Sequence, residues 1–318
     1  MHHNKKLILP VLIFLAGCLA LAAVLYHSYR TNLKQVRAVT ELNAITYAER
    51  LQNDMNRGVA ITDTLEEIVL SENGKIDNFQ KVAGNLMTDF VQSIQVAPDG
   101  VVTDIYPEAG NEAGKIDLIH DESRGEICRY GRDKNIVTMQ GPFDLKQGGR
   151  GIAIRNPVYL ECPDGTSAFW GFTIVIIRIP EVFEKSVQAL TQFGYDYCLT
   201  KTVSPLSDDT EVVSSSGNIL KEPITFEFEF CGSTFGLEVM PTDGWNHGWN
   251  ILPQLVFGIS IILLLTGLTV IVLVVERHRE ILKKMAITDP LTGLLNRKGF
   301  DEQLKKMIQD LSLIHISE

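Results

Sequence analysis

Two glycine-rich segments come nearest to the spacing of a phosphate-binding loop. The first, Gly110-Asn-Glu-Ala-Gly-Lys115, is shorter than the P-loop pattern and lacks the Ser or Thr that should follow its lysine. The second, Gly148-Gly-Arg-Gly151, precedes a β-branched run, so no helix N-terminus is available to hold a phosphate. We reject the first as a nucleotide site and expect a tight turn at the second.

The cysteines are the next candidates for chemistry. Cys18 lies in an apolar run, and the other four lie farther along at Cys128, Cys162, Cys198 and Cys231. Four cysteines permit three pairings if the segment that holds them is exported. Disulfides Cys128–Cys162 and Cys198–Cys231 are one interpretation. Small buried thiols are the other interpretation, and the sequence leaves both open.

Catalytic and metal-binding patterns are the last to be searched for. No CxxC or mixed His and Cys spacing indicates zinc, so we expect no metal site. His120 and His247 have no nucleophile or ligand partner at a recognisable spacing. The sequence between the apolar runs therefore predicts binding rather than catalysis.

The net charge of the chain argues against one class of partner, nucleic acid. The chain has 318 residues with 29 Lys and Arg against 39 Asp and Glu, which is an ordinary globular composition. Residues 27–250 hold 19 basic and 32 acidic side chains, a net charge of −13. A field of this sign repels nucleic acid, so we expect no nucleic-acid partner.

Two apolar runs bracket this acidic segment. Residues 7–26 and 251–275 contain no charged side chain, and about 20 such residues cross a bilayer as a helix. We therefore expect a multi-pass protein of a bacterial cytoplasmic membrane. The basic side chains just after the second run are Arg277, Arg279, Lys283 and Lys284. Because basic residues beside a span stay inside, both termini, including residues 1–6, are expected in the cytoplasm and residues 27–250 outside.

The N-terminus permits a second interpretation. Lys5 and Lys6 followed by a short apolar stretch resemble a secretory signal, and Leu15-Ala-Gly-Cys18 has the form of a lipoprotein cleavage box. However, the apolar run continues to Tyr26 without a polar break, and its length suffices to span the membrane. We favour the uncleaved helix.

Helical and strand-like patterns alternate in the outer segment. Residues 29–57 lack Gly and Pro and predict a helical stalk leaving the membrane, and residues 77–92 carry apolar side chains at helical spacing with Asp77 as a candidate cap. Pro98-Asp-Gly100 predicts a hairpin turn. The expected strands are residues 93–97, 101–106, 151–160, 169–179 and 224–230.

Several ordered motifs in this segment resemble one sensor family. They are Ala97-Pro-Asp-Gly-Val-Val102, Ile105-Tyr-Pro107, Gly141-Pro-Phe-Asp-Leu145, Gln147-Gly-Gly-Arg-Gly151, Arg155-Asn-Pro-Val-Tyr159 and Phe169-Trp-Gly-Phe172. Together they resemble the CHASE domain, an extracellular sensor of bacterial cyclases, histidine kinases and plant cytokinin receptors. The resemblance implies an α+β membrane protein in which two transmembrane helices flank a stalk helix and two PAS-like subdomains. These would occupy about residues 85–185 and 186–240.

The resemblance also implies a small extracellular ligand in the first subdomain. In the plant receptors an acidic side chain before the Gly-Pro-Phe strand holds adenine, and the matching position here is Ser123, which argues against cytokinin. The candidate ligand-binding residues are Tyr106, Ser123, Met139, Phe143, Leu145 and Arg155. Arg155 either binds an anionic ligand or pairs with one of the local carboxylates. The alternative for the whole set is ordinary sheet core and surface charge.

A second resemblance follows the second apolar run. Residues 276–288 predict a linker helix, and Asp289-Pro-Leu-Thr-Gly-Leu-Leu-Asn-Arg-Lys-Gly-Phe300 resembles the opening of a GGDEF domain, the diguanylate cyclase module. The motif positions are Asp289, Leu291, Thr292, Gly293, Leu294, Asn296, Arg297 and Phe300. A GGDEF domain would begin at residues 289–310. Its catalytic residues are not in this chain, and Mg²⁺ and GTP are implied only for the rest of that domain.

The last residues call for separate treatment. Leu311-Ser-Leu-Ile-His-Ile-Ser-Glu318 resembles the translation of an adapter used in sequencing libraries. We therefore expect the natural sequence to be represented only to about Asp310, and residues 311–318 to have no function.

These observations predict a membrane-bound sensor whose intact form makes cyclic di-GMP from two GTP. Because two GTP sites must meet, a parallel homodimer through the stalk is expected. Two alternatives are a degenerate GGDEF output that acts as a nucleotide receptor and a CHASE receptor histidine kinase. The motif at residues 289–300 argues against the kinase.

Overall fold

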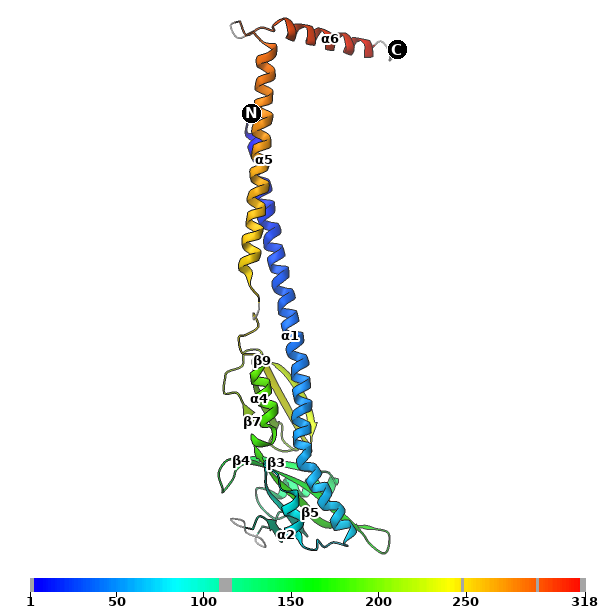
Figure 1. Ribbon diagram of the computed structural model, residues 1–318. Coiled ribbons are helices and arrows are strands. Elements are labelled where there is room, and N and C mark those ends of the chain that lie inside the picture. The colour runs from blue at the N-terminus through cyan, green and yellow to red at the C-terminus, as the bar shows by residue number, and fades with distance from the viewer. Residues whose placement is uncertain (1–2, 109–115, 247–248, 290–291, 315–318) are drawn as a thin grey trace. The chain divides into compact units, whose positions relative to one another are not determined.

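The computed structural model describes residues 3–108, 116–246, 249–289 and 292–314 (Figure 1). In chain order the elements are α1 (His3–Ser71), α2 (Phe79–Leu86), β1 (Val91–Pro98), β2 (Asp104–Tyr106), α3 (Gly125–Lys134), β3 (Thr138–Asp144), β4 (Arg150–Glu161), β5 (Ser167–Ile179), a short 3₁₀ helix η1 (Glu181–Phe183), α4 (Glu184–Gln192), β6 (Tyr195–Thr202), β7 (Thr210–Ser215), β8 (Ile224–Phe230), β9 (Ser233–Pro241), α5 (Ile251–Ile287) and α6 (Arg297–Ile314). Two units result, one of Leu33–His247 and one of Met1–Asn32 with Gly248–Glu318.

The first helix is longer than the sequence indicated. α1 includes the stalk expected at residues 29–57 and continues through Gly58 to Ser71. The expectation that the helix ends at Arg57 is therefore wrong. A β-carbon at Gly58 would lie 2.8 Å from Cδ1 of Ile154 and 3.1 Å from Cγ2 of Ile177, so the glycine allows the helix to approach the sheet closely.

The unit of Leu33–His247, here named the outer unit, contains a five-stranded antiparallel sheet in the order β2-β1-β5-β4-β3. The expected hairpin is confirmed, with Gln95 opposite Ile105 and a turn through Gly100 at φ 84°. The predicted turn at Gly148 is also confirmed, because its N–H donates to the Leu145 carbonyl at 2.9 Å. The rejected glycine-rich loop at residues 110–115 lies outside the described residues.

The helix expected at residues 77–92 is shorter in the structure. α2 covers only Phe79–Leu86, and the residue before it, Asn78, has a φ of 55° and makes no side-chain cap. Asp77 is therefore not the cap. Val91 pairs with Ile177 of β5, so hydrogen bonding to the sheet overrides the helical spacing at this end.

A four-stranded antiparallel sheet follows in the order β7-β6-β9-β8. The alternation predicted for residues 224–230 is confirmed in β8, where Phe230 is buried and Glu227 and Glu229 are exposed. Phe228 stacks on Phe235 of β9, with ring centroids 5.3 Å apart.

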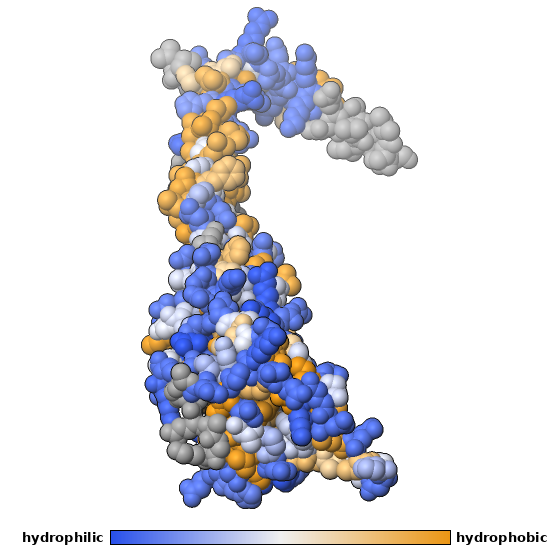
Figure 2. Space-filling view, turned by 60° about the horizontal axis from the view of Figure 1, so that its bottom comes forward, coloured by the Kyte–Doolittle hydropathy of each residue, from blue (hydrophilic) through white to orange (hydrophobic). Residues whose placement is uncertain are grey.

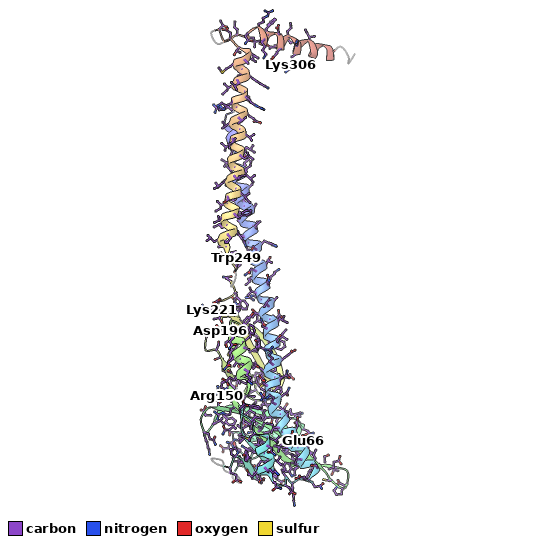
Figure 3. All side chains as sticks on the ribbon, in the orientation of Figure 1. Glu66, Arg150, Asp196, Lys221, Trp249 and Lys306 are labelled. Carbon is purple, nitrogen blue, oxygen red and sulfur yellow. The ribbon has the colours of Figure 1, made fainter. Side chains whose placement is uncertain are left out.

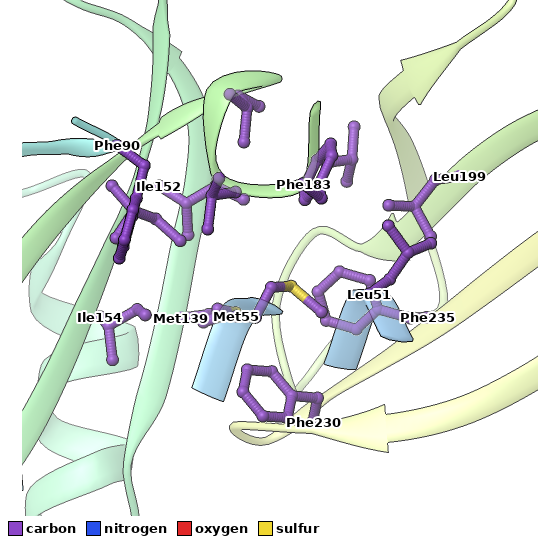
Figure 4. Close-up of a cluster of buried hydrophobic side chains, with 14 of the residues drawn as sticks. Leu51, Met55, Phe90, Met139, Ile152, Ile154, Phe183, Leu199, Phe230 and Phe235 are labelled. Carbon is purple, nitrogen blue, oxygen red and sulfur yellow. The ribbon is translucent and has the colours of Figure 1, made fainter. Parts of the chain in front are cut away.

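Side chains of α1 join the cores of the two sheets. Leu51 and Met55 are at most 1% exposed and lie among buried side chains from both sheets (Figure 4). Arg150, labelled in Figure 3, donates from its guanidinium to the carbonyls of Val212 at 3.2 Å and Val213 at 3.4 Å. The outer unit is therefore two small sheets held along one helix, as the α+β expectation required.

The other unit contains the apolar runs. α1 and α5 are long and apolar enough to cross a membrane, each with an 18-residue window of mean hydropathy 2.8. Figure 2 shows hydrophobic colour concentrated on the part of the surface that these apolar runs form. The helices pack where a β-carbon at Gly17 would lie 2.9 Å from Ile262, and Tyr29 meets Trp249 edge-on at 5.0 Å. The aromatic pair suits an interfacial belt.

The described residues of the segment that resembles a GGDEF opening follow α5 and continue into the first turn of α6. The Asp289 carboxylate accepts hydrogen bonds from the Thr292 N–H at 2.9 Å and its hydroxyl at 3.0 Å. Asn296 caps α6, whose first residue is Arg297, by accepting from the Gly299 N–H at 2.9 Å. The other described motif positions are Gly293 at φ 68° and the exposed Leu294 and Phe300. Leu291 lies outside the described residues.

All five cysteines fall in the described part of the chain and are free thiols. Neither Cys128–Cys162 nor Cys198–Cys231 is bridged in the structure. Cys128 is fully buried in α3, where burial raises the pKa of its thiol. Burial likewise raises the pKa of Cys231 to about 12. Cys128 thus fits the interpretation of a buried thiol, whereas Cys162, Cys198 and Cys231 are only partly buried, and the disulfide pairing stays a prediction.

Candidate ligand-binding site

A cavity of about 640 Å³ lies against one face of the five-stranded sheet. Its floor is formed by pairs of side chains from three neighbouring strands, Ser93 and Gln95 of β1, Ala153 and Arg155 of β4, and Ile174 and Ile176 of β5. Its volume is within the roughly 300–1,000 Å³ of most small-molecule sites. Half of the six floor side chains are polar, namely Ser93, Gln95 and Arg155, so this lining is more polar than that of most such sites.

The cavity and the stalk helix α1 contact opposite faces of the five-stranded sheet. The residues between the floor positions are Ile154 of β4 and Val175 and Ile177 of β5, and all three lie close to Gly58 of α1. Successive side chains of a strand point to opposite faces. The cavity and α1 therefore lie on opposite faces of strands β4 and β5.

The structure brings four of the six predicted ligand-binding residues together at this cavity. They are Ser123, Phe143, Leu145 and Arg155. The sequence analysis missed several neighbours, among them Arg124, Gln140 and Lys146. Gln140 follows from Arg155 through the strand pairing. Ala153 lies on the same face of β4 as Arg155, and Gln140 of β3 pairs with Ala153.

Tyr106 and Met139 do not line the cavity. Tyr106 packs on α2, where a β-carbon at Gly84 would lie 3.3 Å from its ring. Met139 is 0% exposed and lies in the core with Met55 of α1 (Figure 4). In both cases the adjacent residue, Ile105 or Gln140, lines the cavity instead. Both predictions differ by one position along the strand from the residue that lines the cavity. The motifs locate a strand in the sequence, but they do not show which face of the sheet each side chain points to.

Ser123 contributes mainly its backbone. Its hydroxyl donates to the Asp121 carboxylate at 2.8 Å, and its N–H donates to the same oxygen at 2.9 Å. The hydroxyl hydrogen bond is the largest cause of the lowered pKa of Asp121. The Ser123 carbonyl accepts from Gln140 Nε2 at 2.9 Å. This bond fixes the Gln140 amide, so that its Oε1 is the atom left to face a ligand.

Arg155 is the most buried charge of the cavity, at 4% exposure. Burial lowers the pKa of its guanidinium, and Nη1 has no hydrogen-bond partner among the described residues. The neighbouring Cys128 does not neutralise it, because burial raises the pKa of that thiol and keeps it protonated at pH 7. An arginine in this state is a donor for an incoming acceptor.

The lining carries more positive than negative charge. Arg124, Lys146 and Arg155 face one described carboxylate in the lining, Asp144. This excess stands out because residues 27–250 have a net charge of −13. The lining has no paired nucleophile and base, and the described residues include no cluster of three His, Cys, Asp or Glu that fits a metal ion. The arrangement suits reversible binding of a polar small molecule.

Several solved sensor structures are similar to this chain at low identity. The extracellular ligand-binding receptor from Desulfohalobium retbaense DSM5692 has a TM-score of 0.47 at 12% identity, and the match covers 63% of this chain but only 39% of that one. The periplasmic sensory domain of the Campylobacter jejuni chemoreceptor Tlp1 has a TM-score of 0.43 at 13% identity, covering 69% of this chain and 99% of that one.

The ligand-binding domain of the Pseudomonas aeruginosa PAO1 amino-acid chemoreceptor PctC, solved with GABA, has a TM-score of 0.39 at 11% identity and covers 65% of this chain and 97% of that one. These identities are too low to indicate a shared ligand. No curated protein matches the chain.

The family comparison is more direct. The CHASE domain family model matches residues 26–211, which is more than half of the chain. The match is wider than the motif-bearing stretch of about residues 85–185. It extends from α1 to the start of β7 and includes every residue named above as lining the cavity. The chain therefore belongs to the CHASE domain family.

Proposed function

We propose that the protein is a membrane receptor whose CHASE domain binds a small molecule in the cavity on the five-stranded sheet. The observation that carries this proposal is the shared sheet, since strands β4 and β5 present one face to the cavity and the other to α1. A ligand that prefers one arrangement of these strands shifts the population of α1 positions. Because α1 also contains the first apolar run, such a shift reaches the membrane.

Ligand binding is tested with the full chain in detergent micelles, by thermal unfolding against a panel of small metabolites. A ligand at a hundred times its dissociation constant should add about 2.7 kcal/mol of stability. Phe143→Ala removes a cavity side chain and should weaken binding, whereas Tyr106→Ala, outside the cavity, should leave affinity unchanged. Equal affinity in both variants would place the ligand elsewhere.

We assign residues 27–250 to the outside of the membrane and both termini to the cytoplasm. Support comes from the basic side chains that follow the second apolar run, which include Arg277 and Lys284 near the end of α5. An alkaline phosphatase fusion after residue 310 should be inactive and a fluorescent-protein fusion there should be bright. The reverse pattern would overturn this orientation.

For the output we propose diguanylate cyclase activity of the intact protein. The support is the GGDEF-like segment from Asp289 to Phe300 directly after the linker part of α5. The described residues offer no cluster that fits Mg²⁺, so we place neither Mg²⁺ nor GTP in this chain. Reading the gene beyond the codon for Asp310 should reveal the Gly-Gly-Asp-Glu-Phe loop, and expression should raise cyclic di-GMP. An altered loop that still binds cyclic di-GMP would favour a receptor, and a phospho-acceptor histidine would favour a kinase.

We further propose that the receptor is a parallel dimer through α1. Leu42 supports this, because it is 65% exposed on the stalk although its side chain is apolar. Leu42→Cys should cross-link two chains under mild oxidation in membranes. Glu41→Cys, rotated by about 100° around the helix, is the matched control and should cross-link less. Equal cross-linking at both positions would contradict an interface on this face.

A further inference from the structure

In the part of the chain that the structure describes, two of the cavity-lining residues, Gln140 and Arg155, carry unpartnered polar atoms, and a third such atom belongs to Thr138, next to them on the β3–β4 pair. Among the described residues, Thr138 Oγ1, Gln140 Oε1 and Arg155 Nη1 are buried without a hydrogen-bond partner. Thr138 lies directly opposite Arg155 in the β3–β4 pairing, and Gln140 lies two residues along β3 on the same face. Such diagonal neighbours lie about 7–8 Å apart, with their Cβ atoms somewhat closer. One small molecule is long enough to reach both Arg155 and Gln140.

A buried guanidinium without an acceptor costs free energy of folding. The nearby carboxylates, Asp121 and Asp144, are therefore the first candidates for a partner of Arg155. The Asp121 carboxylate accepts from the Ser123 hydroxyl at 2.8 Å and lies 3.9 Å from the Arg124 guanidinium. Asp144 is exposed and lies opposite Arg150 in the β3–β4 register, at the end of β3 away from Thr138. No described carboxylate forms an ion pair with Arg155.

We propose that the cavity binds a small organic oxyanion that accepts hydrogen bonds from Arg155 and donates one to Gln140 Oε1. This inference rests on the proposed function and names the chemical class of the ligand. The planar fork of arginine matches both carboxylate and phosphate oxygens, and such charge-assisted bonds are stronger than neutral ones. Arg124 and Lys146 add positive charge to the wall.

The donor requirement narrows the class further. Gln140 Nε2 is held by the Ser123 carbonyl at 2.9 Å, so Oε1 is presented as an acceptor. A ligand that satisfies both residues carries a hydroxyl, ammonium or amide N–H group a few bonds from its anionic group. Hydroxy acids, amino acids and sugar phosphates have this pattern, whereas a neutral hydrocarbon leaves both protein groups unpaired.

The test compares matched pairs of probes on the full chain in detergent. Lactate and lactamide, serine and serinamide, and glycerol 3-phosphate and glycerol differ in the anionic group within each pair, and inorganic phosphate is a further arm. We expect thermal stabilisation by the anionic member and little by the neutral member. Response to the carboxylates alone or to the phosphates alone identifies which oxyanion is bound, and either result supports the inference.

Variants provide a second readout. Arg155→Gln should weaken binding of the anionic probe about 10- to 100-fold, and Arg155→Lys should restore part of it. Arg132→Gln is the matched control, because Arg132 pairs with Asp133 on the exposed surface and lies outside the cavity. Arg155→Gln removes an unpaired buried charge, so the variant should fold, and circular dichroism checks this. The selectivity of the unaltered protein for the acids needs no variant at all.

Two results would overturn the inference in distinguishable ways. If neutral probes bind as well as anionic ones, and Ala153→Phe at the cavity floor abolishes binding while Arg155→Gln does not, the oxyanion class is wrong and the proposed receptor function stands. If neither the matched probes nor the wider metabolite panel stabilises the full chain, the ligand-binding function itself fails, and this inference fails with it.

Discussion

Arg155 and Asn156 are adjacent on strand β4 and face opposite sides of the sheet. Arg155 lines the cavity, and Asn156 donates from Nδ2 to the Glu66 carboxylate of α1 at 2.6 Å (Figure 3 labels Glu66). Thr173 of β5 makes a parallel contact by donating to the Thr62 carbonyl at 3.0 Å. Under the proposed function, a ligand at Arg155 that displaces β4 would therefore act on α1 through the next residue.

Replacing Asn156 by alanine should loosen this connection. Asn156 is 6% exposed and its amide bonds a charged acceptor, so we expect Asn156→Ala to lower the free energy of unfolding by about 1.5–3 kcal/mol. Ligand affinity should hold, because Asn156 does not line the cavity. Thermal unfolding and ligand titration check both results. Asn53→Ala, on an exposed part of α1, is the control, and equal stability of the two variants would contradict this role.

The close approach of α1 to the sheet depends on Gly58. A β-carbon there would lie 2.8 Å from Ile154 and 3.1 Å from Ile177, so Gly58→Val should overpack this contact. We expect a loss of about 1–3 kcal/mol in the free energy of unfolding, measured by thermal denaturation. Ala60→Val adds similar bulk at an exposed position of the same helix and should change stability little. A neutral Gly58→Val would mean that the helix does not rest on these strands.

Motifs and periodicity predicted most of this fold, and the errors share a physical origin. The β8 alternation and the turn at Gly100 depend on neighbours in sequence, so local rules suffice. Gly58 and Val91 depend on the sheet that each meets, and no local rule contains that partner. The same difference between local and long-range information applies to the residues of the cavity. Arg155 was predicted from its type within a motif, whereas Gln140 required knowledge of which face α1 covers.

A buried ion pair in the four-stranded sheet leads to a test by double substitution. Lys201 is 0% exposed, and its Nζ lies 3.0 Å from the Glu211 carboxylate and donates to the Thr202 carbonyl at 2.7 Å. Burial lowers the pKa of Lys201 in spite of this pair. Glu211→Ala leaves the ammonium without its partner and should cost about 3 kcal/mol or more of the free energy of unfolding.

Removal of both charges should recover most of this loss. Lys201→Met with Glu211→Ala leaves no unpaired charge, so we expect the double variant to be more stable than Glu211→Ala alone. Thermal unfolding of the two single variants and the double variant completes the cycle. Additive losses would show that Lys201 and Glu211 do not interact.

Stability should respond to pH in opposite directions at two aspartates. Burial raises the pKa of Asp63 on α1 above its usual value, so its ionised form costs stability in the folded protein above that pKa, and the cost disappears as pH falls below the unfolded value of 3.8. Hydrogen bonds led by the Thr166 hydroxyl lower the pKa of Asp164, so its ionised form contributes stability at neutral pH that is lost as pH falls through the lowered value.

The pair Asp63→Asn and Asp164→Asn tests this difference in sign. At neutral pH, Asp63→Asn should raise the melting temperature and Asp164→Asn should lower it, and both differences should shrink as the pH approaches the acid range. Glu66 and Cys231 lie near Asp63, since Glu66 shares the Asn156 amide and the negative charge of Asp63 raises the pKa of Cys231. Repeating the series with Cys231→Ser separates the aspartate from the thiol. A destabilised Asp63→Asn at neutral pH would mean that its hydrogen bond from Asn156 outweighs the cost of burial.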